Sequence, residues 1–201
     1  VKHTYGTNYG DHRFYARVCE LILRLKGNFL WPAMWSWAFY ADDPQNSKTA
    51  SEMGVIIGTS HHEPMARNHQ EWSRKRKEYG AWDYTTNQKV IDQFFREGIK
   101  RMQGTEDIVT IGMRGDGDAA MSKSTNVKLL ENVVKNQRKI IEEVTKRPAK
   151  ETPQVWALYK EVLDYYDKGM RVPDDVIMLL CDDNWGNVCR LPNAKERKHP
   201  G

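Results

Sequence analysis

Residues 107–118 read Asp107-Ile108-Val109-Thr110-Ile111-Gly112-Met113-Arg114-Gly115-Asp116-Gly117-Asp118 and change character half-way along. The first half is largely apolar and β-branched, which favours a short buried strand. The second half holds an arginine, two carboxylates and two glycines, which is typical of a tight turn that brings charged groups close to a ligand. The stretch therefore predicts a strand with catalytic or ligand-binding side chains at its carboxyl end.

The same order recurs along the chain. Short apolar runs predict five strands, at residues 28–31, 55–58, 107–112, 154–158 and 176–181. Helical patterns lie between and around them, at residues 14–25, 42–54, 64–79, 87–103, 127–144 and 162–169. Strands that alternate with helices indicate βαβ units and a parallel sheet, and the near-continuous apolar runs indicate strands buried on both faces.

Polar side chains gather directly after four of these strands. They are His61, His62 and Glu63; Arg114, Asp116 and Asp118; Tyr159, Lys160 and Glu161; and Asp182, Asp183 and Asn184. A doubly wound sheet collects its ligand-binding groups mainly at one switch point, whereas a (β/α)8 barrel collects them from many strand ends. We therefore expect the α/β class, with a partial (β/α)8 TIM-type barrel of about five parallel strands. Five strands cannot close an eight-stranded barrel, so residues 1–201 would be either a fragment or part of a larger fold.

Composition limits the classes of partner. The chain has 201 residues, 39% of them hydrophobic, and a net charge of +4. No apolar run approaches the roughly 20 residues that span a bilayer. The basic run 74–77 is flanked by acidic residues, which favours a solvated helix face over a nucleic-acid site. We expect neither a membrane nor a nucleic-acid partner, and the three cysteines show no metal-binding spacing.

Three carboxylates are the candidate catalytic groups. Asp116 and Asp118 stand beside Arg114, and a carboxylate next to an arginine is usually ionised, which suits a general base. An Asp/Gly turn with an internal Arg–Asp pair is the plainer interpretation. Glu161 lies two residues after Tyr159, and an acid against an aromatic surface acquires the raised pKa that a general acid needs. A solvated glutamate at a helix start is its plainer interpretation.

Two further clusters suggest ligand binding. His61, His62 and Glu63 favour hydrogen bonding to a polar ligand over metal binding, since adjacent histidines on a strand cannot both face one metal. The run Asp182-Asp183-Asn184-Trp185 combines acids, an amide and an aromatic ring, as carbohydrate sites do. An N-cap cluster remains the alternative there. Tryptophans at 31, 35 and 37 suit either an aromatic platform or barrel core, and we favour core.

Taken together, five ordered motifs resemble the catalytic domain of glycoside hydrolase family 115. They are residues 25–35 (LKGNFLWPAMW), 58–65 (GTSHHEPM), 112–118 (GMRGDGD), 158–162 (LYKEV) and 182–187 (DDNWGN). The resemblance runs from about residue 10 to residue 192. The chain lacks two family motifs, an Asn-Asp-Glu core before the first helix and a later strand end with Tyr and His. An acid or base from outside residues 1–201 therefore stays open.

The resemblance implies an activity. Family members remove 4-O-methyl-D-glucuronic acid, or glucuronic acid, linked α-1,2 to xylose in glucuronoxylan, with inversion and without a cofactor. They are typically secreted, large multidomain proteins that often form homodimers. The resemblance therefore implies that residues 1–201 are an incomplete catalytic domain of such an enzyme. It also implies that the partners are glucuronoxylan and aldouronic acid oligosaccharides. The family's active-site positions match Arg114, Asp118, Tyr159, Glu161 and Asn184. On chemistry and position we add Asp116 as catalytic, and His61, His62, Glu63, Asp183 and Trp185 as substrate-binding residues.

Inversion needs an acid and a base about 6.5–9.5 Å apart, with a water between base and sugar. We expect Glu161 to be the acid and Asp118 the base, with Asp116 as a substitute for either. Arg114 suits the uronate carboxylate, because a planar fork matches it bidentately. Tyr159 and Asn184 would bind sugar hydroxyl groups. Two alternatives stay open: a non-catalytic carbohydrate-binding barrel fragment, and a metal-dependent hydrolase that uses His61, His62, Asp116, Asp118 and Asp182.

Overall fold

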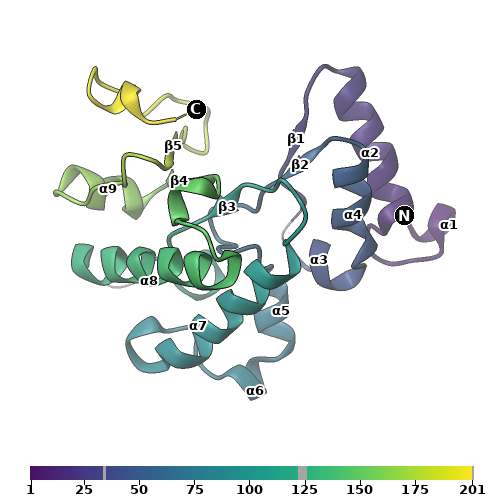
Figure 1. Cartoon of the computed structure of the whole chain (residues 1–201), viewed down its shortest axis with the longest axis horizontal. Coiled ribbons are helices and arrows are strands. Elements are labelled where there is room, and N and C mark those ends of the chain that lie inside the picture. Colours follow the sequence, from purple (N-terminus) through teal and green to yellow (C-terminus); the bar gives the residue numbers. More distant parts are fainter. Residues whose placement is uncertain (34, 122–125, 201) are drawn as a thin grey trace.

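The computed structural model describes residues 1–33, 35–121 and 126–200 (Figure 1). Met34, which belongs to the first of the five motifs, lies outside these ranges. Within them the strands are β1 (Phe29–Leu30), β2 (Ile56–Ile57), β3 (Val109–Thr110), β4 (Gln154–Leu158) and β5 (Ile177–Leu180). Each strand falls inside one of the five segments that the sequence predicts, although four of the five are shorter.

All strand pairs are parallel. β1 pairs with β2, with Phe29 opposite Ile56, and β4 lies between β3 and β5 in a second sheet. One backbone hydrogen bond joins the two sheets, from the Ile108 amide to the Ile57 carbonyl at 2.9 Å. The α/β class and the parallel strands are therefore confirmed, and neighbouring strands follow the order of the sequence.

Helices precede the first strand and lie between the later strands, as expected. They are α1 (Lys2–Tyr5), α2 (His12–Arg24), α3 (Phe39–Asp42), α4 (Gln45–Glu52), α5 (His69–Arg74), α6 (Arg76–Tyr79), α7 (Tyr84–Arg101), α8 (Val127–Thr145) and α9 (Glu161–Asp167). Short 3-10 turns are η1 (Asp116–Asp118), η2 (Ala149–Glu151) and η3 (Glu196–Lys198). Figure 1 shows α2 and α4 beside β1 and β2, while α7 and α8 pack against each other under β3.

Local caps explain where several helices begin. The Asp11 side chain accepts hydrogen bonds from the amides of Arg13 and Phe14 at the start of α2. Asn126 caps α8 in the same way, and Asn68 forms a capping box with Glu71 at the start of α5. These bonds satisfy amide groups that have no partner inside the helix, so they fix the first turn.

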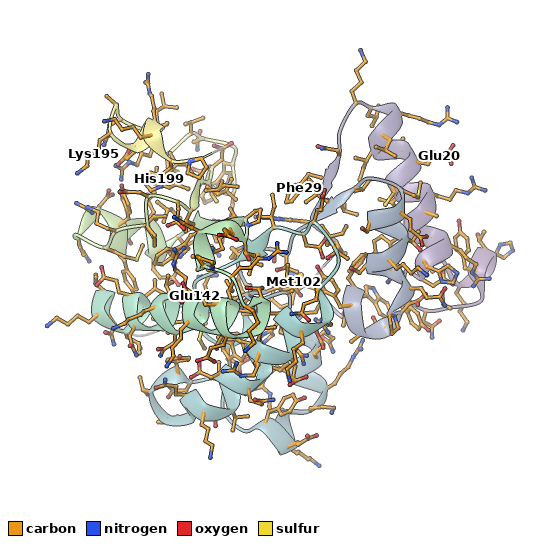
Figure 2. All side chains as sticks on the ribbon, in the orientation of Figure 1. Glu20, Phe29, Met102, Glu142, Lys195 and His199 are labelled. Carbon is orange, nitrogen blue, oxygen red and sulfur yellow. The ribbon has the colours of Figure 1, made fainter. Side chains whose placement is uncertain are left out.

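An aromatic cluster forms part of the apolar core. The Trp72 ring contacts Trp82 and Phe94 edge to face, with centroids 4.8 and 5.1 Å apart. The expectation that the tryptophans of residues 31–37 are core is wrong for two of them, because Trp35 is 55% and Trp37 38% exposed. Figure 2 draws the side chains on the ribbon in the orientation of Figure 1.

Gly112 connects β3 to the turn that carries Arg114. Its φ is 93°, in the region that favours glycine, and an added Cβ would lie 2.5 Å from Nε1 of Trp156. The Gln137 side chain accepts a hydrogen bond from the Gly112 amide and donates one to the Gly112 carbonyl, both at 2.8 Å. These contacts therefore restrict the backbone to one conformation where the chain leaves β3.

We expect Gly112→Ala to lower the free energy of unfolding by roughly 2 kcal/mol or more, because backbone strain and a clash with Trp156 add up. Thermal melting of the full-length protein measures this. Gly104→Ala is the matched control: its φ is 91°, but nothing lies within 4 Å of the added Cβ. Equal losses in the two variants would show that Trp156 does not restrict this turn.

Candidate active site

Arg114 joins residues from two strand ends. Its Nε and Nη2 donate to the two carboxylate oxygens of Glu161 at 3.0 and 2.7 Å. Its Nη1 donates to the Asp118 carbonyl at 2.6 Å and also contacts the Asp118 carboxylate. The arginine is 4% exposed, whereas the side chains of Asp118 and Glu161 remain 17% and 16% exposed. One buried guanidinium thus holds two carboxylates that the sequence separates by 43 residues.

Two histidines fix Asp118. The His61 Nε2 lies 2.9 Å from the Asp118 carboxylate, and the Asp118 amide donates to Nε2 of His62 at 3.1 Å. Burial opposes ionisation of Asp118, but the charge of Arg114 and the nearby His61 lower its pKa below the ordinary value. Burial lowers the pKa of His62 to about 3, so its Nε2 stays available to accept. Asp118 is therefore an ionised carboxylate on a well-anchored turn.

Asp116 belongs to a different set of contacts. It accepts hydrogen bonds from both terminal nitrogens of Arg76 and lies 3.1 Å from His69 Nε2. Hydrogen bonding to Arg76 lowers its pKa. Asp116 borders a cavity of about 110 Å³, which is further lined by Trp35, His62, His69, Gln70, Ser73, Arg76 and Gly117.

Tyr159 and Asn184, both predicted to bind sugar hydroxyl groups, contact each other. The Tyr159 hydroxyl donates to Oδ1 of Asn184 at 3.2 Å, and the Tyr159 ring lies 4.5 Å from the His61 ring. The adjoining Asp183 binds its own loop, since it accepts hydrogen bonds from the amides of Trp185 and Asn187 at 2.9 Å. Trp185 is 85% exposed. The sugar-binding roles of Asp183 and Trp185 stay predictions.

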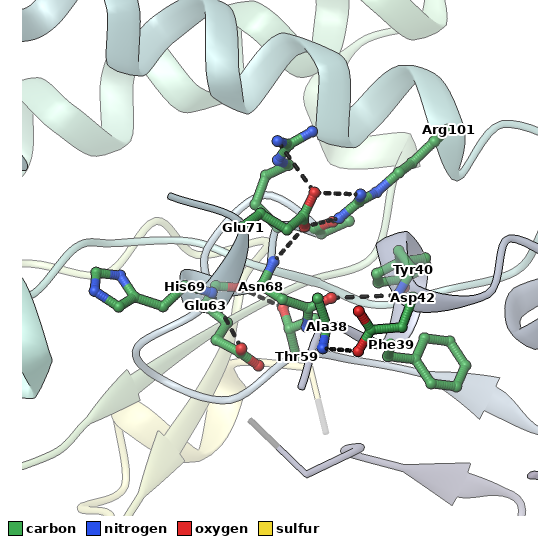
Figure 3. A network of polar contacts seen from close by, with 12 residues as sticks. Ala38, Phe39, Tyr40, Asp42, Thr59, Glu63, Asn68, His69, Glu71 and Arg101 are labelled. Carbon is green, nitrogen blue, oxygen red and sulfur yellow. Dashed lines mark hydrogen bonds and ion pairs between the residues drawn. The ribbon is translucent and has the colours of Figure 1, made fainter. Parts of the chain in front are cut away.

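Glu63 lies in the interior rather than at the surface of the site. It is 1% exposed, and its Oε1 accepts from the His69 amide at 3.2 Å, in the network that Figure 3 draws. Its Oε2 has no partner among residues 1–33, 35–121 and 126–200. Burial raises the pKa of Glu63 to about 8. The structure thus places this carboxyl group in the protein interior.

The raised pKa makes a prediction about stability. Glu63 has an ordinary pKa of 4.5 in the unfolded chain, so the folded state binds its proton more tightly. Its contribution to stability is therefore present at low pH and is lost as pH rises from about 4.5 to about 8. We expect Glu63→Gln to match the wild type at pH 4 and to melt at least about 2–4 °C higher at pH 8.

Glu71→Gln is the control for that melting series. Glu71 is buried too, but it pairs with Arg101 at 2.7 Å and with Arg67 at 3.1 Å, and its pKa is lowered despite burial. Its substitution should lower the melting temperature at pH 8. A lower melting temperature for Glu63→Gln at pH 8 would contradict the account of the buried carboxyl group.

The family follows from comparison with known proteins. The model of the glycosyl hydrolase family 115 matches residues 1–201. The chain belongs to glycoside hydrolase family 115. No curated protein matches it significantly. The part of this family 115 chain that the structure describes contains no helix that could cross a membrane.

A solved structure gives the same result. It is a family 115 4-O-methyl-α-glucuronidase with specificity for decorated arabinogalactans, 37% identical to this chain, with a TM-score of 0.87. The match covers 98% of this chain and 27% of that one. This family 115 chain thus spans about a quarter of the length of the solved relative.

Two residues that contact Asp116, His69 and Arg76, are not among the candidates that the sequence pattern indicates. Arg76 lies in the basic run that we interpret as a solvated face, 40 residues before the Asp116 that it binds. His69 opens α5, where the sequence gives no sign that its ring faces the turn after β3. Both contacts join parts of this family 115 chain that only the fold brings together. Groups of three His, Cys, Asp or Glu side chains placed to bind a metal are absent from the described ranges.

Proposed function

We propose that this chain provides catalytic residues for removing glucuronic acid, or its 4-O-methyl ether, from an α-1,2 linkage to xylose in glucuronoxylan, with inversion. Membership of family 115 and the 4-O-methyl-α-glucuronidase activity of the solved relative support it. The single observation that carries it is the pair of partly exposed carboxylates, Asp118 and Glu161, on one buried arginine. Glycosidases of this type need two carboxyl groups that flank the scissile bond.

The two carboxylates differ in their surroundings, which supports different roles. Asp118 has a lowered pKa and accepts from Arg114 and from His61, if His61 carries its proton on Nε2. An ionised carboxylate suits the base that activates water. Within residues 1–33, 35–121 and 126–200, Glu161 forms an ion pair with Arg114 alone, at the other side of the guanidinium. We assign Glu161 to the acid that protonates the leaving oxygen.

Arg114 is assigned a positioning role rather than direct binding of the uronate. Four of its contacts already go to oxygen atoms of Asp118 and Glu161, and the side chain is buried. A substrate carboxylate would have to displace one of these partners. Tyr159 and Asn184, which touch each other at the same rim, suit sugar hydroxyl groups.

The larger context is part of the proposal. The bond from Ile108 to Ile57 and the sequential order of the parallel strands support five consecutive strands of a (β/α)8 barrel. In that arrangement the chain is an incomplete catalytic domain of a larger enzyme, secreted and homodimeric as family members are. Other parts of that enzyme would then complete the barrel and the site.

The direct assay incubates the full-length protein with aldouronic acids and, separately, with decorated arabinogalactan, and measures released uronic acid. We expect release from the α-1,2-linked xylose substrates. Release from arabinogalactan alone would indicate that the substrate is a decorated arabinogalactan, as for the solved relative. Binding without release would favour the carbohydrate-binding alternative, and activity that a chelator abolishes would favour the metal-dependent one.

A further inference from the structure

The charges at the site do not balance. Arg114 contributes one positive charge, while Asp118 and Glu161 contribute two negative charges when both are ionised. Asp116 is already paired with Arg76, so that pair adds no net charge. A uronic acid substrate brings a further carboxylate to this place. Without another cation, like charges would repel in a partly buried site, where such repulsion is strong.

Lys160 lies where such a cation is needed. It stands between Tyr159 and Glu161 and precedes α9. Its Nζ is 4.9 Å from the centroid of the Tyr159 ring, the ring that also contacts His61. Its charge acts on His61, which holds Asp118. The lysine therefore lies at the same rim as the two carboxylates.

Two properties separate Lys160 from an ordinary surface lysine. It is exposed, and within residues 1–33, 35–121 and 126–200 none of the ion pairs includes it, whereas Arg114, which lies over the same Tyr159 ring, is paired with Asp118 and Glu161. Its backbone has φ 50° and ψ −125°, outside the regions that side chains other than glycine prefer. Such strain persists where the surrounding structure fixes a residue, and it gathers at functional sites.

We propose that Lys160 binds the carboxylate of the uronic acid and so makes the enzyme specific for acidic over neutral sugars. This inference rests on the proposed function. When Glu161 carries the proton that an acid must deliver, Arg114 neutralises Asp118, and Lys160 is left to match the uronate. The contact between its Nζ and the Tyr159 ring keeps the ammonium group at this rim.

The test compares two substrates of the full-length enzyme, an aldouronic acid and its uronate methyl ester, which lacks the negative charge. We expect Lys160→Met to lower kcat/KM on the acid by about tenfold to a hundredfold, mainly through KM, and to leave the ester unchanged. The ratio of kcat/KM on the acid to kcat/KM on the ester, which measures the preference for the acid, should therefore fall by the same factor. Lys160→Arg should restore most of that preference, since it keeps the charge.

Lys150→Met is the matched control, because Lys150 is exposed in η2, at the opposite end of β4. It should behave as the wild type on both substrates. An unchanged acid-to-ester preference in Lys160→Met, with an unchanged melting temperature, overturns the inference. Equal losses on acid and ester also overturn it, since they indicate a structural role. A wild type that releases no uronic acid instead contradicts the proposed function itself.

Discussion

Asp118→Asn and Glu161→Gln are each expected to lower turnover of an aldouronic acid by at least about a hundredfold in the full-length enzyme, the low end for general acid–base catalysis. Both substitutions keep the shape of the side chain and remove its titration. The Asp118 amide would still donate to His62, so the turn should survive. Initial rates of uronic acid release measure the effect, and thermal melting checks that each variant folds.

A second substrate separates the two roles. An aryl uronide with a good leaving group needs little help from an acid, but water must still be activated. Glu161→Gln should therefore recover much of its rate on the aryl substrate, while Asp118→Asn stays slow. Asp175→Asn is the control, because Asp175 pairs with Arg138 away from the site and should keep full activity. Full activity of Glu161→Gln on the natural substrate would make an acid from outside residues 1–201 the leading candidate.

Arg114→Lys is expected to lower turnover by roughly a hundredfold or more, even though the charge is kept. Lysine cannot bind Glu161 through two parallel hydrogen bonds and reach Asp118 at the same time. Arg114 lowers the pKa of Asp118, so its loss as a hydrogen-bond donor should move the acidic limb of the kcat/KM profile to higher pH. Rates measured between pH 4 and pH 8 test both points.

Arg96→Lys is the matched control for that profile. Arg96 pairs with Glu143 at 2.6 Å on the helices α7 and α8, and its substitution should leave the profile unchanged. If Arg114→Lys raised KM for the acidic substrate alone and left kcat and the acidic limb in place, Arg114 would bind the uronate directly. The positioning role would then be wrong.

The sequence is sufficient for the elements and for much of the site. Strand positions follow from apolar runs bounded by glycine and polar turns. Arg114 meets Asp118 because the two stand four positions apart on one turn. The meeting of Tyr159 with Asn184 follows from adjacent parallel strands, whose carboxyl ends share an edge. These contacts depend on local pattern and strand order, which a sequence displays.

Other features depend on how distant parts of the chain pack. Glu63 is next to two histidines in the sequence, yet it turns inward while His61 reaches Asp118. Arg76 stays 45% exposed, as the basic run suggests, yet its guanidinium binds Asp116, which lies 40 positions later in the sequence. Trp35 and Trp37 look like core residues by composition but remain exposed. Hydrophobicity alone gives no direction to a side chain in an irregular loop.

The most direct test of the central claim follows the reaction of the full-length enzyme with an aldouronic acid by proton NMR during the first minutes. The account predicts that the β-anomer of the free uronic acid forms first and that Asp118→Asn and Glu161→Gln each abolish most of this signal. First formation of the α-anomer would contradict inversion. Undiminished release in both variants would contradict the assignment of Asp118 and Glu161 as the catalytic pair.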